Sequence, residues 1–198
     1  MLNFAYQEHV RSYYFDSRNQ DFQFSPLTQI EHADVCVIGA GFFGLSAALE
    51  LAEKGKKVIV LEGARVGFGA SGRSGGQAIN GFEEGIDEYV KQVGEDKAHK
   101  LWNMSLEAID IIDERIEKYG IQCDWKKGYA TLALNERRMN DLIEIEKESH
   151  ENFGYQNMQL WDKAKLKQHL GSDIYVGGLF DSNSGHLHPL NYCLGLAK

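Results

Sequence analysis

The chain has 198 residues and a formal net charge of −8, from 29 acidic and 21 basic residues. This length allows one domain or one and a half, and 43% hydrophobic and 25% charged residues are ordinary for a soluble globular protein. The acidic balance argues against a nucleic-acid partner. The three cysteines form no C-x-x-C pair, and the N-terminus has no apolar run of the signal-peptide type, so we expect a cytoplasmic protein.

Residues 1–32 are polar and aromatic, with Tyr13, Tyr14 and Phe15 in a row. We interpret them as an irregular N-terminal arm that docks on the body of the protein. The alternative is a disordered tail, but such tails are usually poor in aromatic residues.

Residues 33–62 have the pattern of a β-α-β dinucleotide-binding unit. An apolar strand is expected at 35–38, followed by a helix that stops at Gly55. A second apolar strand at 58–61 ends at Glu62. The turn between the first strand and the helix consists of Gly39, Ala40, Gly41, Phe42, Phe43 and Gly44.

Two further expectations concern the first strand of this unit. Cys36 lies in it and is expected to be a small buried core residue. The stretch 35–49 carries no charge, but fifteen residues that include three glycines are too short to span a bilayer, so no membrane partner is expected.

The residue types in this unit suit the binding of a diphosphate. A helix N-terminus offers unpaired N–H groups and the positive end of the helix dipole. Gly39 permits a tight turn, Gly41 lets the backbone approach the pyrophosphate, and Gly44 lets the helix pack closely on the sheet. The carboxylate of Glu62 can accept hydrogen bonds from the adenine ribose and would repel a 2′-phosphate, which disfavours an NADP-type ligand.

A second glycine-rich segment, residues 63–82, follows Glu62 directly. Up to Gln77 it combines many glycines with two arginines and two serines, which makes it flexible and rich in N–H and cationic groups. A flavin dinucleotide extends past its pyrophosphate and could run along such a loop, whereas NAD enzymes do not usually need one there. The alternative is a solvent loop with two surface arginines.

The rest of the chain predicts further helices and strands. Helices are expected at 95–119, 136–153 and 162–170, and short strands at 121–125, 129–134 and 175–180, with a turn at Lys127-Gly128 between the first two strands. A last helix, 190–197, has no stop signal before Lys198. Because a doubly wound sheet needs more than two parallel strands, we expect the chain to be the N-terminal part of a larger fold.

Three motifs together resemble the D-amino-acid-oxidase-like (DAO) family of FAD-dependent oxidoreductases. They are VIGAGFFGLSAALELA, LEGARVGFGASGRSGGQ and GHLHPL, and they occur in the family's order over essentially the whole chain. Within the family the chain is most similar to the γ-glutamylputrescine oxidoreductases, a subgroup that the early Ser12-Tyr13-Tyr14 also fits. One departure is Ser74, where that subgroup tends to have asparagine.

The resemblance implies an α/β fold: a Rossmann-like FAD-binding β-α-β unit plus the first part of an α+β substrate domain, incomplete in this chain. Residues 33–82 and 176–198 would belong to the FAD-binding domain, 83–175 to the substrate domain, and 1–32 to the N-terminal arm. Residues lining FAD would be Gly39, Ala40, Gly41, Phe42, Phe43 and Gly44 at the pyrophosphate, Glu62, Gly63 and Arg65 at the adenosine, Ala70 and Ser71 at the diphosphate, and Arg73, Ser74, Gly75, Gly76 and Gln77 at the flavin.

The implied reaction is oxidation at the CH–NH group of an amine or amino-acid-like substrate of the γ-glutamylputrescine type, a step of polyamine catabolism. FAD would take up hydride from the substrate, and molecular oxygen is the expected acceptor. The alternatives are an NAD-dependent dehydrogenase, against which the loop 67–77 argues, and a non-catalytic fragment that does not retain cofactor.

No catalytic residue can be assigned from the sequence. His186 and His188 are one residue apart and could share a face of an extended segment, where two imidazoles could bind a metal. No cysteine or acid cluster accompanies them, so no metal is expected. A direct acid–base role stays open, and the resemblance makes this segment a structural return to the FAD-binding domain.

Overall fold

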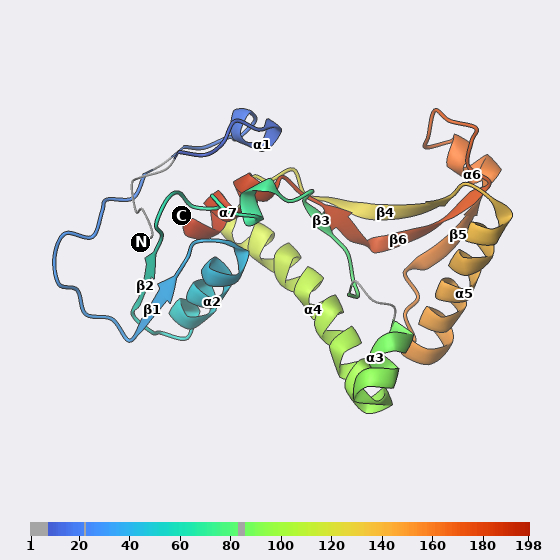
Figure 1. Ribbon diagram of the computed structural model, residues 1–198, viewed down its shortest axis with the longest axis horizontal. Helices are drawn as coiled ribbons and strands as arrows, with labels where there is room; N and C mark the ends of the chain where they lie inside the picture. The colour runs from blue at the N-terminus through green and yellow to red at the C-terminus, as the bar shows by residue number, and fades with distance from the viewer. Residues whose placement is uncertain (1–7, 22, 83–85) are drawn as a thin grey trace. The chain divides into compact units, whose positions relative to one another are not determined.

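The computed structural model describes residues 8–21, 23–82 and 86–198 (Figure 1). The chain divides into two compact units. The first consists of Met1–Gly76, Asp113–Trp125 and Leu187–Lys198, and the second of Gln77–Ile112 and Lys126–His186. The long helix α4 (Glu95–Tyr119) begins in the second unit and ends in the first.

The first unit contains the predicted β-α-β motif. Strand β1 (Val35–Ile38) pairs in parallel with β2 (Val58–Leu61), and helix α2 (Phe42–Glu53) connects them. Gly39 makes the turn out of β1 with a φ of +100°, a conformation that side-chain-bearing residues rarely adopt. The three predicted elements are therefore confirmed at their predicted positions.

The expected burial of Cys36 in β1 is wrong, and Val35 and Val37 are only partly buried. Cys36 is exposed, and Ile38 is 88% exposed. Successive side chains of a strand point to opposite faces, and only one face of the β1–β2 pair is covered by α2. In the described residues the other face is open, so the side chains on it face solvent.

Helix α7 (Pro189–Ala197) is the most deeply buried element of the first unit. Its residue Leu190 is 1% exposed, and Cys193 is fully buried. It packs on the short 3₁₀ helix η1 (Ser71–Arg73) and on α2. The helix predicted at 190–197 is confirmed, with Pro189 as its first residue.

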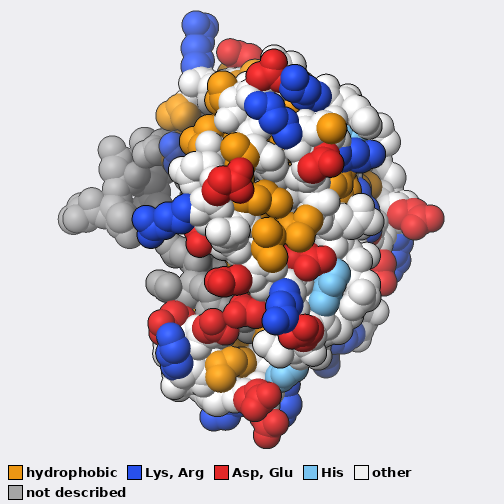
Figure 2. All heavy atoms as spheres, turned by 90° about the vertical axis from the view of Figure 1, so that its right-hand side faces the viewer, with side chains coloured by type: hydrophobic (Ala, Val, Ile, Leu, Met, Phe, Trp, Pro, Cys, Tyr) orange, Lys and Arg blue, Asp and Glu red, His pale blue; other side chains and the backbone are white. Residues whose placement is uncertain are grey.

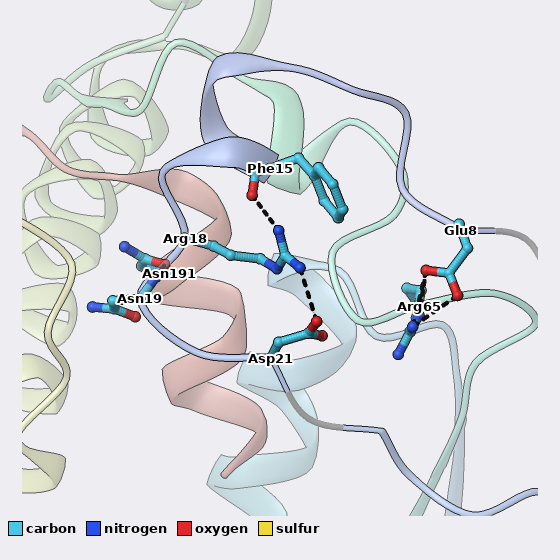
Figure 3. A network of polar contacts seen from close by, with 7 residues as sticks. All are labelled: Glu8, Phe15, Arg18, Asn19, Asp21, Arg65 and Asn191. Atoms are coloured by element: carbon cyan, nitrogen blue, oxygen red, sulfur yellow. Dashed lines mark hydrogen bonds and ion pairs between the residues drawn. The ribbon is translucent and has the colours of Figure 1, made fainter.

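Residues 8–21 of the N-terminal arm pack within the first unit, whereas residues 23–32 are irregular and exposed. The arm contains a short helix α1 (Tyr13–Asp16), which begins where the Ser12 hydroxyl accepts a hydrogen bond from the Phe15 N–H. The backbone N–H of Asn19 donates to the Asn191 side chain over 3.0 Å (Figure 3). The hydrogen bond between Asn19 and Asn191 connects segments that are 172 residues apart in sequence.

The second unit is built on an antiparallel sheet. Strand β6 (Gly177–His186) pairs with β4 (Lys126–Ala133), β5 (Met158–Asp162) and the two-residue β3 (Gln77–Ala78). Helix α5 (Glu136–Phe153) begins at the Asn135 cap and ends at Gly154, as predicted. It packs on the sheet through a small core of Ala133, Leu142, Leu179, Met139, Met158 and Val176.

Several strands of this unit differ from the prediction. Residues 121–125 are irregular, and 126–133 form one strand rather than two elements joined by a turn. Gly128 has a φ of +105° because it lies at a bulge, where the pairing register shifts between Lys127 and Tyr129. Strand β6 is longer than the predicted 175–180, and the sequence did not predict β5 or helix α3 (Ile86–Val93).

The remaining helices of the second unit lie at its surface. Helix α6 (Lys163–Lys167) falls inside the predicted range 162–170. Figure 2 shows positive and negative side chains interspersed on the side of this unit where α5 and α6 lie. Within the described ranges, no helix is long and apolar enough to cross a membrane.

Candidate functional site

The turn between β1 and α2 presents backbone N–H groups at a helix N-terminus. Gly41 is the N-cap residue of α2, and no side chain of its own caps the helix. The N–H of Phe42 donates to the Ser71 hydroxyl over 3.0 Å, and the N–H of Ala40 donates to Glu62 Oε2 over 2.7 Å. The two glycine-rich segments therefore meet at the start of α2, where the helix dipole favours an anion.

The close approach of α2 to β1 depends on Gly44. A Cβ atom added there would lie 2.0 Å from the carbonyl oxygen of Gly39 and 3.3 Å from a methyl group of Val37. Both Gly44 and Ala40 are buried, whereas Phe43 is 89% exposed in the first turn of the helix. The helix axis is thereby held against the end of the strand.

The carboxylate of Glu62 is held by two backbone N–H groups. Ala40 donates to Oε2, and Ala64 donates to Oε1 over 2.9 Å. A carboxylate oxygen can accept two hydrogen bonds, so each oxygen retains one accepting position. Because Glu62 is exposed, these positions are accessible to the two adjacent hydroxyl groups of a ribose. The donor from Ala64 was not predicted, since any residue type supplies a backbone N–H.

The second glycine-rich segment is fixed against the first by backbone contacts. The N–H of Gly67 donates to the carbonyl of Ala40 over 2.9 Å. A Cβ atom at Gly72 would lie 2.2 Å from the Gly67 carbonyl, and one at Gly76 would lie 2.0 Å from the Leu187 carbonyl. The loop is therefore packed tightly at these positions.

The remaining predicted residues of the first unit lie along this loop. Gly63, Ala70, Arg73 and Gly75 are exposed, and Ser74 is partly buried. The Arg73 guanidinium donates to the Gly69 carbonyl over 3.1 Å and lies 5.7 Å from the centre of the Phe68 ring. Gln77 belongs to the second unit, where it is the exposed first residue of β3.

Arg65 is held by the N-terminal arm. Its guanidinium makes a bidentate pair with the carboxylate of Glu8, with nitrogen–oxygen distances of 2.9 and 3.1 Å (Figure 3). The Arg65 side chain is only 11% exposed. Sequence reasoning missed Glu8, because 57 residues separate the two partners and a single acidic residue near an N-terminus gives no signal.

The two histidines of the GHLHPL motif have different roles in the structure. His186 ends β6 in the second unit, whereas His188 is the N-cap of α7 in the first. His188 Nδ1 accepts a hydrogen bond from the Asn191 N–H over 3.1 Å, so Nε2 carries the proton and donates to the Ser17 hydroxyl over 3.1 Å. Among the residues that the structure describes, no group of three or more His, Cys, Asp and Glu side chains could hold a metal ion.

This cap predicts a pH-dependent stability. Burial lowers the pKa of His188 below its ordinary 6.5, because it removes the charged imidazolium from water. A protonated Nδ1 could also no longer accept the hydrogen bond from Asn191. Burial and the neighbouring Arg65 lower the pKa of His9 in the same direction. The unfolded chain therefore binds more protons than the folded chain as the pH falls below 6.5, and stability decreases.

We expect the free energy of unfolding, measured with urea, to fall between pH 7.5 and pH 5.5, a window of about one unit on each side of the ordinary histidine pKa. His188→Asn should reduce this fall, because asparagine caps helices without titrating. His32→Asn, at an exposed histidine, is the matched control and should leave the fall unchanged. An equal fall in His188→Asn and the unchanged chain would show that His188 does not cause the loss of stability at low pH.

The arrangement of a β-α-β turn, an accessible carboxylate at the end of β2 and a second glycine-rich loop is typical of dinucleotide-binding oxidoreductases. The family model for FAD-dependent oxidoreductases (DAO) matches residues 34–198, and the chain belongs to this family of flavoenzymes. The expected fold class, family and FAD cofactor are thereby confirmed. Enzymes of this family act on small-molecule substrates.

Two curated relatives are similar over nearly all of the chain. The probable oxidoreductase OrdL of Haemophilus influenzae is 96% identical over 198 residues, and the γ-glutamylputrescine oxidoreductase of Escherichia coli is 44% identical over 190 residues. The chain covers 46% of the first relative and 44% of the second. It thus spans less than half the length of the curated relatives that it matches.

Solved structures show the same fold at low sequence identity. The L-amino acid deaminase of Proteus myxofaciens matches with a TM-score of 0.71 at 21% identity, over 91% of this chain and 39% of that chain. The glycine oxidase of Geobacillus kaustophilus matches with a TM-score of 0.63 at 21% identity, over 83% of this chain and 43% of that chain.

Proposed function

We propose that the protein is an FAD-dependent oxidoreductase that oxidises the CH–NH group of an amine or amino-acid-like substrate of the γ-glutamylputrescine type. The 44% identity to the γ-glutamylputrescine oxidoreductase of E. coli supports the substrate class. The main support for an FAD site is the geometry of Glu62. Two backbone N–H groups fix its carboxylate, and each oxygen retains one position that can accept a ribose hydroxyl.

The first unit would bind FAD mainly through its adenosine and diphosphate. The diphosphate would lie at the N-terminus of α2, beside the exposed Phe43 and the Ser71 hydroxyl, and the ribose hydroxyls would donate to Glu62. Arg65 would lie at the adenine, and Ala70 would approach the diphosphate. The residues proposed for the flavin side are Arg73, Ser74, Gly75, Gly76 and Gln77.

The flavin would supply the redox chemistry, since it can accept one hydride equivalent, that is two electrons and a proton, from the substrate. Oxidation of the C–N bond would give an imine, which water hydrolyses to a carbonyl product with release of ammonia or an amine. Molecular oxygen is the proposed acceptor and would be reduced to hydrogen peroxide. The protein's own contribution here is to bind and orient the cofactor.

The substrate class is tested by peroxide formation in FAD-loaded protein. We expect peroxide in proportion to added γ-glutamylputrescine and less with putrescine, which lacks the carboxylate. Turnover of NAD with no change in the flavin spectrum would instead support a nicotinamide-dependent dehydrogenase. Equal rates with both amines would contradict the proposed γ-glutamylputrescine type of substrate.

Glu62→Ala should weaken FAD binding by about 1–3 kcal/mol, the range for a lost hydrogen bond to a charged group. The physical reason is the loss of both ribose acceptors together with the partner of the Ala40 N–H. The dissociation constant can be measured from the quenching of flavin fluorescence. Glu31→Ala, at an exposed glutamate, is the control and should bind FAD like the unchanged chain. An unchanged affinity in Glu62→Ala would remove this residue from the ribose site.

A further inference from the structure

A buried carboxylate in the second unit has no place in the proposed cofactor site. Asp181, in β6, is 5% exposed and accepts three hydrogen bonds. The Tyr155 hydroxyl donates to Oδ1 over 2.7 Å, the Asn183 N–H donates to Oδ1 over 2.9 Å, and the Ser184 hydroxyl donates to Oδ2 over 2.6 Å. Burial and the hydrogen bond to Asp181 raise the pKa of Tyr155 above its ordinary range, so its phenol remains a donor.

Ser184 transmits this arrangement to a second segment. Ser184 is fully buried, and its oxygen accepts from the Asn80 N–H over 3.2 Å. Its hydroxyl has two acceptors within reach, Asp181 Oδ2 at 2.6 Å and Asn80 Oδ1 at 3.1 Å. Because a hydroxyl has one proton, the shorter contact with Asp181 holds it.

The other end of the Asn80 amide is buried. Its Nδ2 group has no hydrogen-bond partner among the described residues and can donate to a bound water molecule. Asn80 is thus connected to the carboxylate of Asp181 through the Ser184 hydroxyl.

The segment 77–82 is anchored at successive residues by this part of the unit. Gln77 pairs with His186, and Ala78 pairs with Gly185. Beyond Asn80, the N–H of Gly81 donates to the Ser105 hydroxyl over 2.9 Å. Gln77 follows Gly76 directly in the chain and is the last residue proposed on the flavin side.

We propose that Asp181 is a positioning residue: through Ser184 and Asn80 it fixes the segment 77–82, and with it the flavin-side end of the cofactor loop at Gln77. The flavin part of this inference rests on the proposed function, whereas the ordering of residues 77–82 does not.

Amide hydrogen exchange in the cofactor-free chain tests the ordering. Ser184→Ala should speed exchange at residues 77–82 by roughly fivefold, the factor for one lost hydrogen bond of typical net strength. Ser182→Ala is the matched control, because Ser182 lies on the same strand but is exposed and donates only to the Asn157 carbonyl. Equal exchange at 77–82 in the two variants, or faster exchange spread evenly over α5 and β4, would overturn the proposal.

Asp181→Asn tests whether the chain of hydrogen bonds from residue 181 through Ser184 to Asn80, here called the relay, orders residues 77–82, or whether only the packing of residue 181 does so. The new amide would donate to Ser184, whose hydroxyl would turn to Asn80, so residues 77–82 should stay close to their original exchange rates. Asp181→Ala also removes the acceptor of the Tyr155 hydroxyl and of the Asn183 N–H and leaves the Ser184 hydroxyl without a fixed partner, so the protection should be lost. Loss of protection in Asp181→Asn equal to that in Asp181→Ala would overturn the relay.

The visible absorption spectrum of FAD-loaded protein tests whether Ser184 affects the surroundings of the flavin. Ser184→Ala should shift the flavin bands, and Ser182→Ala should leave them unchanged. An unshifted spectrum in Ser184→Ala overturns the flavin part of the proposal. Failure of the unchanged chain to take up any FAD contradicts the proposed function instead, and the exchange experiment then still decides the ordering of residues 77–82.

Discussion

Gly44→Ala is expected to destabilise the first unit by about 3 kcal/mol, the upper range for overpacking a well-packed interior. The added Cβ would lie 2.0 Å from the Gly39 carbonyl oxygen and 3.1 Å from its carbonyl carbon. Neither atom can move away without opening the turn between β1 and α2. Urea unfolding followed by circular dichroism measures the effect.

The sign of this change is informative, because Gly44 lies inside a helix. Alanine is favoured over glycine by about 1 kcal/mol in a helix interior, so an uncrowded Gly44 would give a more stable protein on substitution. Gly69→Ala is the control, since a Cβ there meets nothing within 4 Å. A Gly44→Ala protein as stable as the unchanged chain would show that α2 does not pack on β1 as closely as described.

Gly41→Val is expected to weaken FAD binding at least about 100-fold, or about 2.8 kcal/mol, while the chain stays folded. Gly41 has extended backbone angles that any residue can adopt, and its Cβ would meet only the Ser71 hydroxyl, at 2.8 Å. A serine side chain can rotate, so the fold should tolerate the change. The valine methyl groups would occupy the space through which a diphosphate approaches the N–H groups of the turn.

Fluorescence quenching of FAD measures this affinity, and circular dichroism checks the fold. Gly171→Val, at an exposed glycine of the second unit with nothing within 4 Å of its Cβ, is the matched control. Normal FAD binding by a folded Gly41→Val protein would place the diphosphate elsewhere.

The parts of the fold that the sequence predicted well are those set by short-range patterns. The β-α-β unit is confirmed because its strands, turn and helix occupy consecutive residues, and α5 is confirmed because Asn135 and Gly154 mark its ends. The burial of Cys36 was predicted wrongly, since it depends on whether another segment covers the second face of β1.

The errors in the second unit have a similar origin. Gly128 was interpreted as a turn, but its positive φ belongs to a bulge that arises only when β4 pairs with β6. Strand β5 forms by pairing with β6, which lies later in the sequence. The residues of β5 taken alone therefore did not predict a strand.

For the candidate site, the sequence supplied the residue types and the structure supplied their partners. The contacts of Glu62 with Ala40 and of Ser71 with Phe42 join residues that motif spacing already placed together. The pair of Glu8 with Arg65 and the cap of His188 on α7 required the chain's path in three dimensions. The roles of these residues toward FAD stay predictions.

Amide hydrogen exchange with and without FAD tests the central claim, that this chain binds FAD through the start of α2 and the loop that follows β2. FAD should slow exchange at residues 40–44 and 62–76, and flavin mononucleotide, which lacks the adenosine and one phosphate, should not. Binding of FAD with unchanged exchange in both segments, or no binding of FAD to the chain, would contradict the account.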